Sequence, residues 1–218
     1  MLHYREGRCW EGNEIKYIFV MMYYQLPLFF CDKTEWMEKS NGRKDDGSMN
    51  KKHHEEYAPD AIRCKIITVS DTRTPETDKS GKKIMELLQE HHHIISSYEI
   101  VKDDQNEIKR AVLNGALQEE VEVMITNGGT GITKRDVTIE TIQPLLEKEI
   151  VGFGELFRML SYTEDIGSAA ILSRALAGVL NNTVIFSLPG STGAVQLGMN
   201  KLILPEIRHV VGEIKRQH

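Results

Sequence analysis

The sequence predicts an α/β fold in which helices cover both faces of a mostly parallel sheet. Short runs rich in β-branched residues alternate with segments whose apolar residues recur every three to four positions, as in repeated strand–helix–strand units. Loops that contain glycine or aspartate come directly after several of these runs. Because ligands of such sheets bind where the strands end, we expect the functional residues in these loops.

The first three predicted strands cover 62–70, 94–101 and 121–126, which are apolar runs bounded by polar residues. Two amphipathic helices, over 80–92 and 104–118, separate these strands. Their apolar residues fall on one face of each helix. In chain order these residues are Ile84, Leu87, Leu88, Ile108, Val112, Leu113 and Leu117.

The second half of the domain is predicted to hold one more strand, over 183–190, and five helices. The segment over 168–176 is rich in small residues, which favours a closely packed helix. Pro205 fits the first position of the last helix, where its missing N–H is tolerated. The predicted helices cover 138–146, 154–160, 168–176, 194–204 and 205–217.

The beginning of the chain differs in composition from the rest. It holds two of the three cysteines and most of the aromatic residues, without a sustained strand or helix period. A hydrophilic stretch follows. We interpret 1–48 as an N-terminal extension, 49–60 as a linker and 61–218 as the folded domain, with Met49 as the hypothesised natural start.

Composition excludes several classes of protein. Among 218 residues, 27 Lys and Arg stand against 32 Asp and Glu, so a net charge of −5 argues against nucleic acid as a partner. The longest apolar run, 17–30, is shorter than the roughly 20 residues that span a membrane, so no membrane partner is expected. The three cysteines form no disulfide or zinc pattern, which indicates a reducing, cytoplasmic location.

The strongest local motif is ITNGGTGITKRDVT, over 125–138, where Gly128, Gly129 and Gly131 follow a predicted strand. Glycines let a ligand approach the backbone, and successive amides before a helix suit an anion. Asp136 would repel a bound phosphate unless a cation such as Mg²⁺ lay between them. The motif therefore predicts either a metal–nucleotide site or a tight turn in which Asp136 caps the next helix.

Three further loops carry candidate residues. Ser70 and Asp71 end the first strand, either at the ligand edge or as a simple turn. After the second strand, one of Asp103 and Asp104 is expected to cap a helix, which leaves the other carboxylate free. The loop SLPGSTG, over 187–193, predicts either a second anion site at a helix start or a structural turn.

Other chemistry is disfavoured. His91, His92 and His93 adjoin one another at a predicted helix end and do not face one way, and no histidine falls in a candidate loop. Cys64 lies within a predicted buried strand, where packing is the expected role. Catalysis by Ser/His/Asp or Cys/His arrangements is therefore not expected.

Together these motifs resemble the MoaB/MogA family of molybdenum cofactor biosynthesis proteins, particularly its bacterial MoaB branch. The resemblance rests on TVSDTR, DKSG, VKDDQ, TNGGTGITKRDVT, GFGELFR…ILSRALAG and LPGS, and it runs from about Ile62 to the C-terminus. Asn127 stands where many members have Thr or Ser. The resemblance implies a three-layer α/β/α domain that forms a homotrimer or homohexamer and binds molybdopterin.

Active members of the family use Mg-ATP to adenylylate molybdopterin and release pyrophosphate, and the resemblance also implies the molybdenum insertase of the pathway as a partner. It places the family's two important aspartates at Asp103 and Asp136. We expect these two to be catalytic and to hold Mg²⁺, with the glycine-loop amides and a nearby Lys134 or Arg135 bearing the developing charge. The remaining implied pterin or nucleotide contacts are Ser70, Asp71, Gly128, Gly129, Thr130, Gly131, Glu155, Ser173, Arg174, Pro189, Gly190 and Ser191. The alternative is a family member that binds molybdopterin or nucleotide without catalysis.

Overall fold

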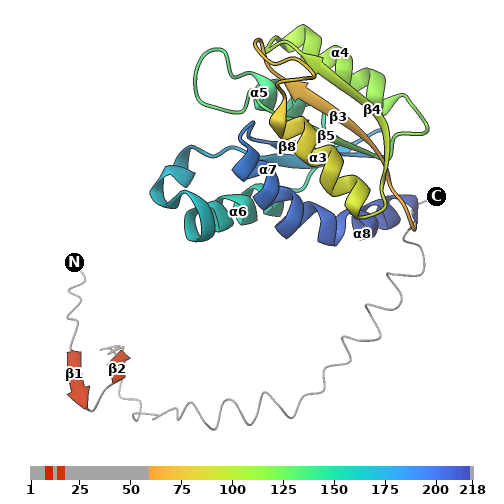
Figure 1. Ribbon diagram of the computed structural model, residues 1–218. Coiled ribbons are helices and arrows are strands. Elements are labelled where there is room, and N and C mark those ends of the chain that lie inside the picture. Colours follow the sequence, from red (N-terminus) through yellow and green to blue (C-terminus); the bar gives the residue numbers. More distant parts are fainter. Residues whose placement is uncertain (1–7, 12–13, 18–58, 217–218) are drawn as a thin grey trace. The chain divides into compact units, whose positions relative to one another are not determined.

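The computed structural model describes residues 8–11, 14–17 and 59–216 (Figure 1). The chain divides into two units, Met1–Asp45 and Asp46–His218, and each is described by itself. In the first unit, β1 (Arg8–Glu11) and β2 (Glu14–Tyr17) form an antiparallel pair. The rest of the proposed extension and most of the linker lie outside the described residues, so their boundaries and the start at Met49 stay predictions.

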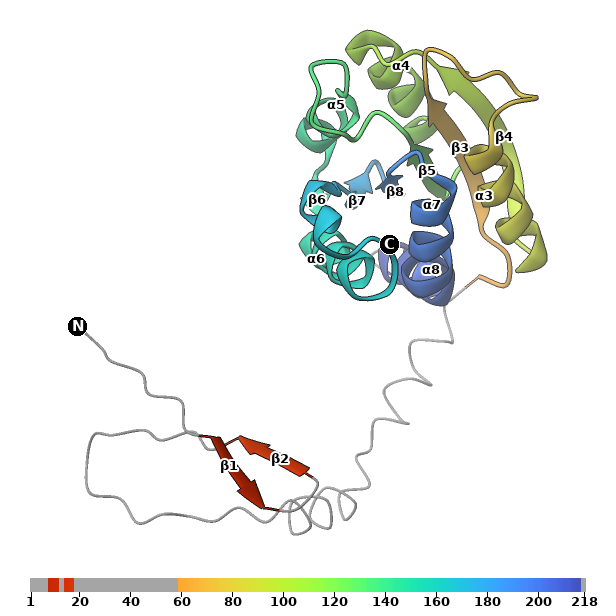
Figure 2. The ribbon, with the colours of Figure 1, turned by 60° about the vertical axis from the view of Figure 1, so that its left-hand side comes forward.

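The second unit is built on a six-stranded sheet in the order β4-β3-β5-β8-β7-β6 (Figure 2). The first four strands of that order are parallel to one another, and β7 is antiparallel to both β8 and β6. The predicted, mostly parallel sheet is therefore confirmed. The strands are β3 (Arg63–Val69), β4 (Ile94–Val101), β5 (Val123–Asn127), β6 (Lys148–Glu149), β7 (Leu176–Leu180) and β8 (Thr183–Leu188).

Helices cover both faces of this sheet, as Figures 1 and 2 show. One buried cluster joins the sheet to α3 (Lys79–Glu90), α6 (Val151–Leu160), α7 (Thr192–Gly198) and α8 (Leu204–Lys215). A second cluster joins the other face to α4 (Gln105–Ala116) and α5 (Thr138–Ile142). The three-layer prediction is thus confirmed. No helix within 59–216 has the length and apolar character needed to cross a bilayer.

Shorter helical turns extend several of these helices. The helix predicted over 138–146 is α5 followed by a 3₁₀ turn, Gln143–Leu145, which contains Pro144. The helices predicted over 194–204 and 205–217 are α7 and α8, joined by the π-helical turn Met199–Ile203. A π-helical turn, Ser161–Asp165, likewise continues α6.

The helix predicted over 168–176 is wrong. A 3₁₀ helix, Gly167–Leu172, ends before Leu176, and β7 then pairs with β8. Asn181 and Asn182 make the turn between these strands with φ of 48° and 63°, the left-handed geometry of a tight hairpin. The small residues of 168–176 suggested a packed helix, whereas the asparagine pair was the signal for a hairpin.

The register of the central strands brings three loops together. Thr68 of β3 lies opposite Asn127 of β5, and Asn127 lies opposite Leu188 of β8. The carboxyl ends of these three adjacent strands therefore lie side by side. The loops that follow them meet at one edge of the sheet, as the predicted topology requires.

Candidate functional site

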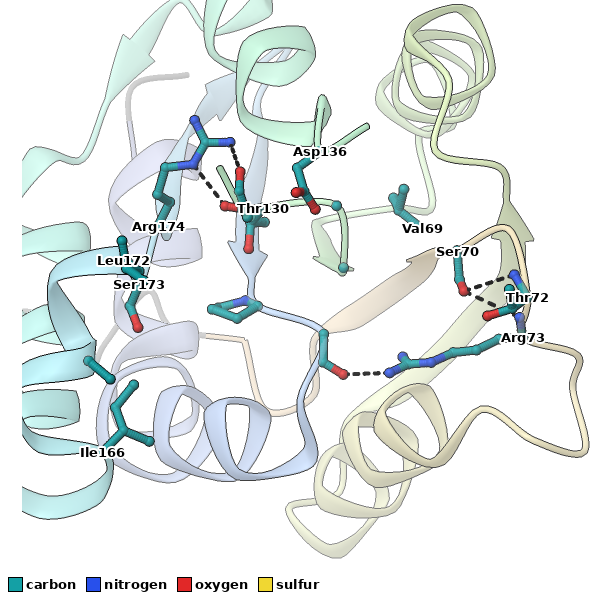
Figure 3. Close-up of a pocket in the computed structure, with 16 residues that line it drawn as sticks. Val69, Ser70, Thr72, Arg73, Thr130, Asp136, Ile166, Leu172, Ser173 and Arg174 are labelled. Carbon is teal, nitrogen blue, oxygen red and sulfur yellow. Dashed lines mark hydrogen bonds between the residues drawn. The ribbon is translucent and has the colours of Figure 1, made fainter. Parts of the chain in front are cut away.

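A cavity of about 480 Å³ lies where the loops after β3, β5 and β8 meet (Figure 3). The segment 166–174, which follows α6, forms its remaining wall. Most of the residues predicted for the site line it. These are Ser70, Gly128, Gly129, Thr130, Gly131, Asp136, Ser173, Arg174, Pro189 and Gly190.

The glycine loop is held in a conformation that favours glycine. Gly128 and Gly129 have φ of 102° and 61°, and a Cβ on Gly128 would collide with the carbonyl oxygen of Val69. The Gly128 amide donates to the Leu188 carbonyl at 3.1 Å. On the other side, the Thr138 amide donates to the carbonyl of Gly129 at 2.9 Å. The backbone of this loop is therefore positioned before any ligand arrives.

Two amides of the loop are available to an anion. The Gly128 amide is used by β8, and the Gly131 amide is bonded to the Asp136 carboxylate. In contrast, the amides of Gly129 and Thr130 donate to no acceptor within the described part of the chain. Adjacent unpaired N–H groups at the edge of a cavity are suited to phosphate oxygens.

Asp136 lines the cavity and does not cap the next helix. Its carboxylate accepts hydrogen bonds from the Thr133 amide at 2.9 Å and from the Thr133 hydroxyl at 2.6 Å. These bonds, which outweigh its partial burial, lower the pKa of Asp136 below the usual value. The cap residue of α5 is Val137, so the interpretation of Asp136 as a helix cap is wrong. Asp136 is an ionised group facing the cavity.

Asp103 lies behind the glycine loop and is not part of the cavity wall. Its Oδ1 accepts from the Val137 amide at 3.4 Å, and a Cβ on Gly129 would lie 2.7 Å from the same oxygen. Burial raises the pKa of Asp103, and the negative charges of Asp136 and Asp71 raise it further. The negative charge of Asp103 is therefore disfavoured by its surroundings, and a nearby cation would stabilise it.

Asp104, the residue after Asp103, has the predicted role of helix cap. Asp104 caps α4, since its carboxylate accepts from the amides of Asn106 at 2.9 Å and Glu107 at 3.1 Å. The prediction that one aspartate of the pair caps the helix and the other stays free of that role is confirmed.

The acidic residues fit a metal ion only in part. Within 59–216, no group of three or more His, Cys, Asp or Glu side chains gathers to hold a metal by protein ligands alone. Magnesium, however, commonly takes only one or two carboxylates and completes its shell with substrate phosphates and water. Asp136 offers one carboxylate at the cavity wall, and Asp103 is near enough for the two negative charges to interact, which suits a magnesium ion that binds together with phosphate.

Asp71 connects two loops outside the cavity. It forms an ion pair with Arg135, and its Oδ1 accepts from the Asp103 amide at 3.3 Å. The hydrogen bond from Arg135 lowers the pKa of Asp71. Asp71, predicted as a ligand contact, is thus engaged by other residues of the protein, and so is Arg135.

Arg174 lines the cavity but uses its guanidinium to hold the loop. Nε donates to the Thr130 carbonyl at 2.8 Å, and Nη2 donates to the Gly131 carbonyl (Figure 3). Nη1 forms an ion pair with Glu140. The geometry gives Arg174 a positioning role on the glycine loop.

Two predicted site residues are not brought to the cavity. Ser191 caps α7 by accepting from the Ala194 amide at 3.2 Å, and Glu155 is exposed on α6. Neither residue lines the cavity within this chain.

Several residues of the cavity were not predicted. Thr72 and Arg73 lie in TVSDTR, and a basic residue in the loop after a predicted strand was a usable signal for Arg73. Ile166, Ala169 and Leu172 form an apolar wall that no motif marked, and the last two lie in the segment predicted to be a closely packed helix.

Comparison with known proteins finds relatives that share most of this chain. A family model described as a probable molybdopterin binding domain matches residues 65–209. Molybdenum cofactor biosynthesis protein B of Bacillus cereus is 62% identical over 169 residues, which cover 78% of this chain and 100% of that protein.

Two solved structures are also similar. The crystal structure of a molybdenum cofactor biosynthesis protein B is 64% identical, with a TM-score of 0.72, and the match covers 73% of this chain and 99% of that one. The tungsten cofactor synthesizing protein MoaB from Pyrococcus furiosus is 41% identical, with a TM-score of 0.65 and coverage of 72% and 99%.

Proposed function

The chain belongs to the MoaB/MogA family of molybdenum cofactor biosynthesis proteins, and we propose that it is a Mg-ATP-dependent molybdopterin adenylyltransferase of that pathway. One observation carries the proposal. The unpaired amides of Gly129 and Thr130 lie at the same cavity edge as the ionised Asp136. Amides alone would suit a simple anion, whereas amides next to a carboxylate suit a phosphate that brings a cation.

The proposed reaction needs no side chain as a general base. The terminal phosphate of molybdopterin, a monoester whose second pKa is about 6, is mostly a dianion at neutral pH. One of its oxygens would attack the α-phosphorus of ATP, and the bond from that phosphorus to the bridging oxygen of pyrophosphate would break. The obstacle is the mutual repulsion of two polyanions, so positioning and charge neutralisation have to carry the catalysis.

The residues of the chain divide these tasks. The amides of Gly129 and Thr130 bind phosphate oxygens, and Arg174 holds the loop that presents them. Asp136 and Asp103 would hold Mg²⁺, whose charge would lower the repulsion between the two substrates. The exposed Lys134 and the paired Arg135 lie next to this site and can add positive charge.

We also propose a homotrimer or homohexamer. Apolar side chains of α6 and the two turns after it are exposed, and Ile171 is 83% exposed. Such a surface on an isolated protomer is typical of a subunit interface. Glu155 lies on the same helix, where a neighbouring subunit could use it. The exposed residues are Val151, Leu156, Met159, Tyr162, Ile166, Ile171 and Leu172.

Light scattering coupled to size-exclusion chromatography tests this assembly, and Ile171→Asp should shift the mass toward a monomer. In the cell, the protein would act in the cytoplasm and pass its product to the molybdenum insertase.

A second function is favoured by the position of Asp103. Because Asp103 lies behind the glycine loop, the cavity wall itself contains a single carboxylate, Asp136. A family member with this arrangement could bind molybdopterin or nucleotide without transferring an adenylyl group.

Pyrophosphate release separates the two functions. With ATP, Mg²⁺ and molybdopterin, the wild type should release pyrophosphate, and Asp136→Asn should lower kcat by about 100-fold, as expected when a charge-stabilising group is lost. Molybdopterin binding, measured by calorimetry, should change little. Asp104→Asn is the matched control, because asparagine still caps α4 and the residue does not line the cavity. Wild-type protein that binds both substrates but releases no pyrophosphate would establish the binding function instead.

A further inference from the structure

A buried carboxylate lies beneath the wall that follows β3. Asp78 is fully buried, and it caps α3. Burial alone would raise its pKa, but the hydrogen bonds to the carboxylate outweigh this effect and the pKa is lowered, so Asp78 is an anion. Its donors are the Thr68 hydroxyl (2.6 Å), Arg73 Nη1 (3.2 Å), the Ser80 hydroxyl (3.0 Å), the Gly81 amide (3.0 Å) and the Tyr98 hydroxyl (2.8 Å).

Arg73 connects this carboxylate to the opposite wall of the cavity. Nη1 donates to Asp78 and to the Ser80 hydroxyl, and it lies 3.4 Å from the Oδ1 of Asn127. Nη2 donates to the carbonyl of Gly190, in the loop after β8, at 2.7 Å (Figure 3). The two ends of one guanidinium therefore hold residues that are more than 100 positions apart in the sequence.

The two loops joined by Arg73 enclose the glycine loop. Since β5 lies between β3 and β8, the ends of the outer strands are about 10 Å apart at ordinary strand spacing. A Cβ on Gly190 would lie 3.1 Å from the Cα of Gly128, so the loop after β8 lies directly against the glycine loop. Any outward movement of Gly190 would widen the cavity and change the surroundings of the Gly129 and Thr130 amides.

We infer that Arg73, anchored by Asp78, is a positioning residue that sets the distance between the Pro189–Gly190 turn and the glycine loop. Its effect on catalysis rests on the proposed function, whereas its effect on the turn does not. A buried ion pair of this kind adds little net stability, because desolvation offsets the attraction. The contribution of the Arg73–Asp78 pair is instead to hold the Pro189–Gly190 turn in one position beside the glycine loop.

The position requires an arginine. A guanidinium offers donors on separate nitrogens in one rigid plane, so Nη1 can bond Asp78 while Nη2 bonds Gly190. A lysine ammonium is a single point and would stay with the buried carboxylate. Arg73→Lys therefore keeps the charge pair and loses the bond to Gly190.

Amide hydrogen exchange tests the inference without substrate. Arg73→Lys should accelerate exchange in peptides covering 186–195 about tenfold, while α3 and β4 keep the wild-type rates. Asp78→Asn, which preserves the cap of α3, should give a smaller change in the same peptides. Arg110→Lys is the matched control, because Arg110 pairs with Glu107 on the surface of α4 and should leave all rates unchanged.

Each outcome decides the matter. Selective acceleration in 186–195 supports the inference, whereas unchanged rates there, or equal acceleration throughout 59–216, would overturn it. In the pyrophosphate assay, Arg73→Lys should lower kcat about tenfold with KM changed less than about threefold, as expected for misplacement of bound substrate. A wild type without pyrophosphate release would reject the transferase proposal, and the exchange result would still decide the role of Arg73.

Discussion

Two ion pairs that involve the loop after β3, Asp78–Arg73 and Asp71–Arg135, differ in burial and in the number of hydrogen bonds to the carboxylate. Asp78–Arg73 is anchored by a carboxylate with no exposure and five donors, whereas Asp71–Arg135 joins surface loops and leaves the Arg135 side chain 76% exposed. The first pair includes Arg73, which lines the cavity and also bonds Gly190. The second lies outside the cavity wall, where water and salt weaken it, so Arg135 would lose little by exchanging Asp71 for a phosphate.

Removing one carboxylate from each pair tests most directly whether the buried pair contributes more to stability than the exposed pair. Asp78→Ala should lower the free energy of unfolding by about 3 kcal/mol, because it removes a helix cap and leaves the buried donors unpaired. Asp71→Ala should leave the free energy of unfolding almost unchanged, because an exposed ion pair adds little to stability. Urea denaturation followed by circular dichroism measures both values. Equal losses from the two variants would mean that burial does not distinguish the pairs.

The next largest effect is expected from a substitution in the glycine loop, which should change both stability and nucleotide binding. Gly129→Ala would place a side chain at φ 61° and against the Asp103 carboxylate, which should cost about 1–3 kcal/mol. It should also abolish nucleotide binding by calorimetry, because the amide positions change. Gly152→Ala, on the exposed surface of α6 with nothing near the added Cβ, is the control. Unchanged nucleotide affinity in Gly129→Ala would contradict the phosphate role of the loop.

The smallest expected effect concerns pH. The raised pKa of Asp103 means that the folded protein holds this proton more tightly than the unfolded chain. Stability from this group therefore falls as pH rises from about 3.9, the ordinary aspartate value, through the folded pKa. At neutral pH the unfavourable contribution is fully present.

Asp103→Asn removes that contribution and should raise the melting temperature at pH 7 by about 2 °C while lowering pyrophosphate release. Asp78→Asn should do the opposite to stability, because the lowered pKa of Asp78 stabilises the fold above about pH 3.9. Calorimetric scans between pH 4 and 7 test both signs. A lower melting temperature for Asp103→Asn at pH 7 would show that its charge is already compensated.

Much of the fold and part of the site followed from local sequence. The second strand was predicted over 94–101 and is observed as Ile94–Val101, because its pattern is strong and its ends are polar. The glycine loop was located because three glycines and an aspartate follow a predicted strand, a pattern that indicated either an anion site or a tight turn. Asp104, one of the two aspartates expected to cap a helix, has that role.

The rest depended on tertiary structure. Whether Asp103 faces the cavity or lies behind Gly129 is set by the packing of two loops, which residue spacing does not encode. The role of Arg73 depends on the strand order β3-β5-β8, since only that order brings Gly190 within its reach. The apolar wall 166–172 is a 3₁₀ segment whose exposure depends on what surrounds it.

The late position of β8 in the chain has a consequence for biosynthesis. This strand is made after β3, β4 and β5, yet it pairs with β5 at the centre of the sheet, and Leu188 accepts the hydrogen bond that holds Gly128. A polypeptide released from the ribosome before residue 188 would lack both that bond and the Pro189–Gly190 turn, to which Arg73 donates a hydrogen bond. Chains that end before residue 188 would therefore lack the assembled glycine loop, and with it the proposed binding site, until the sheet is complete.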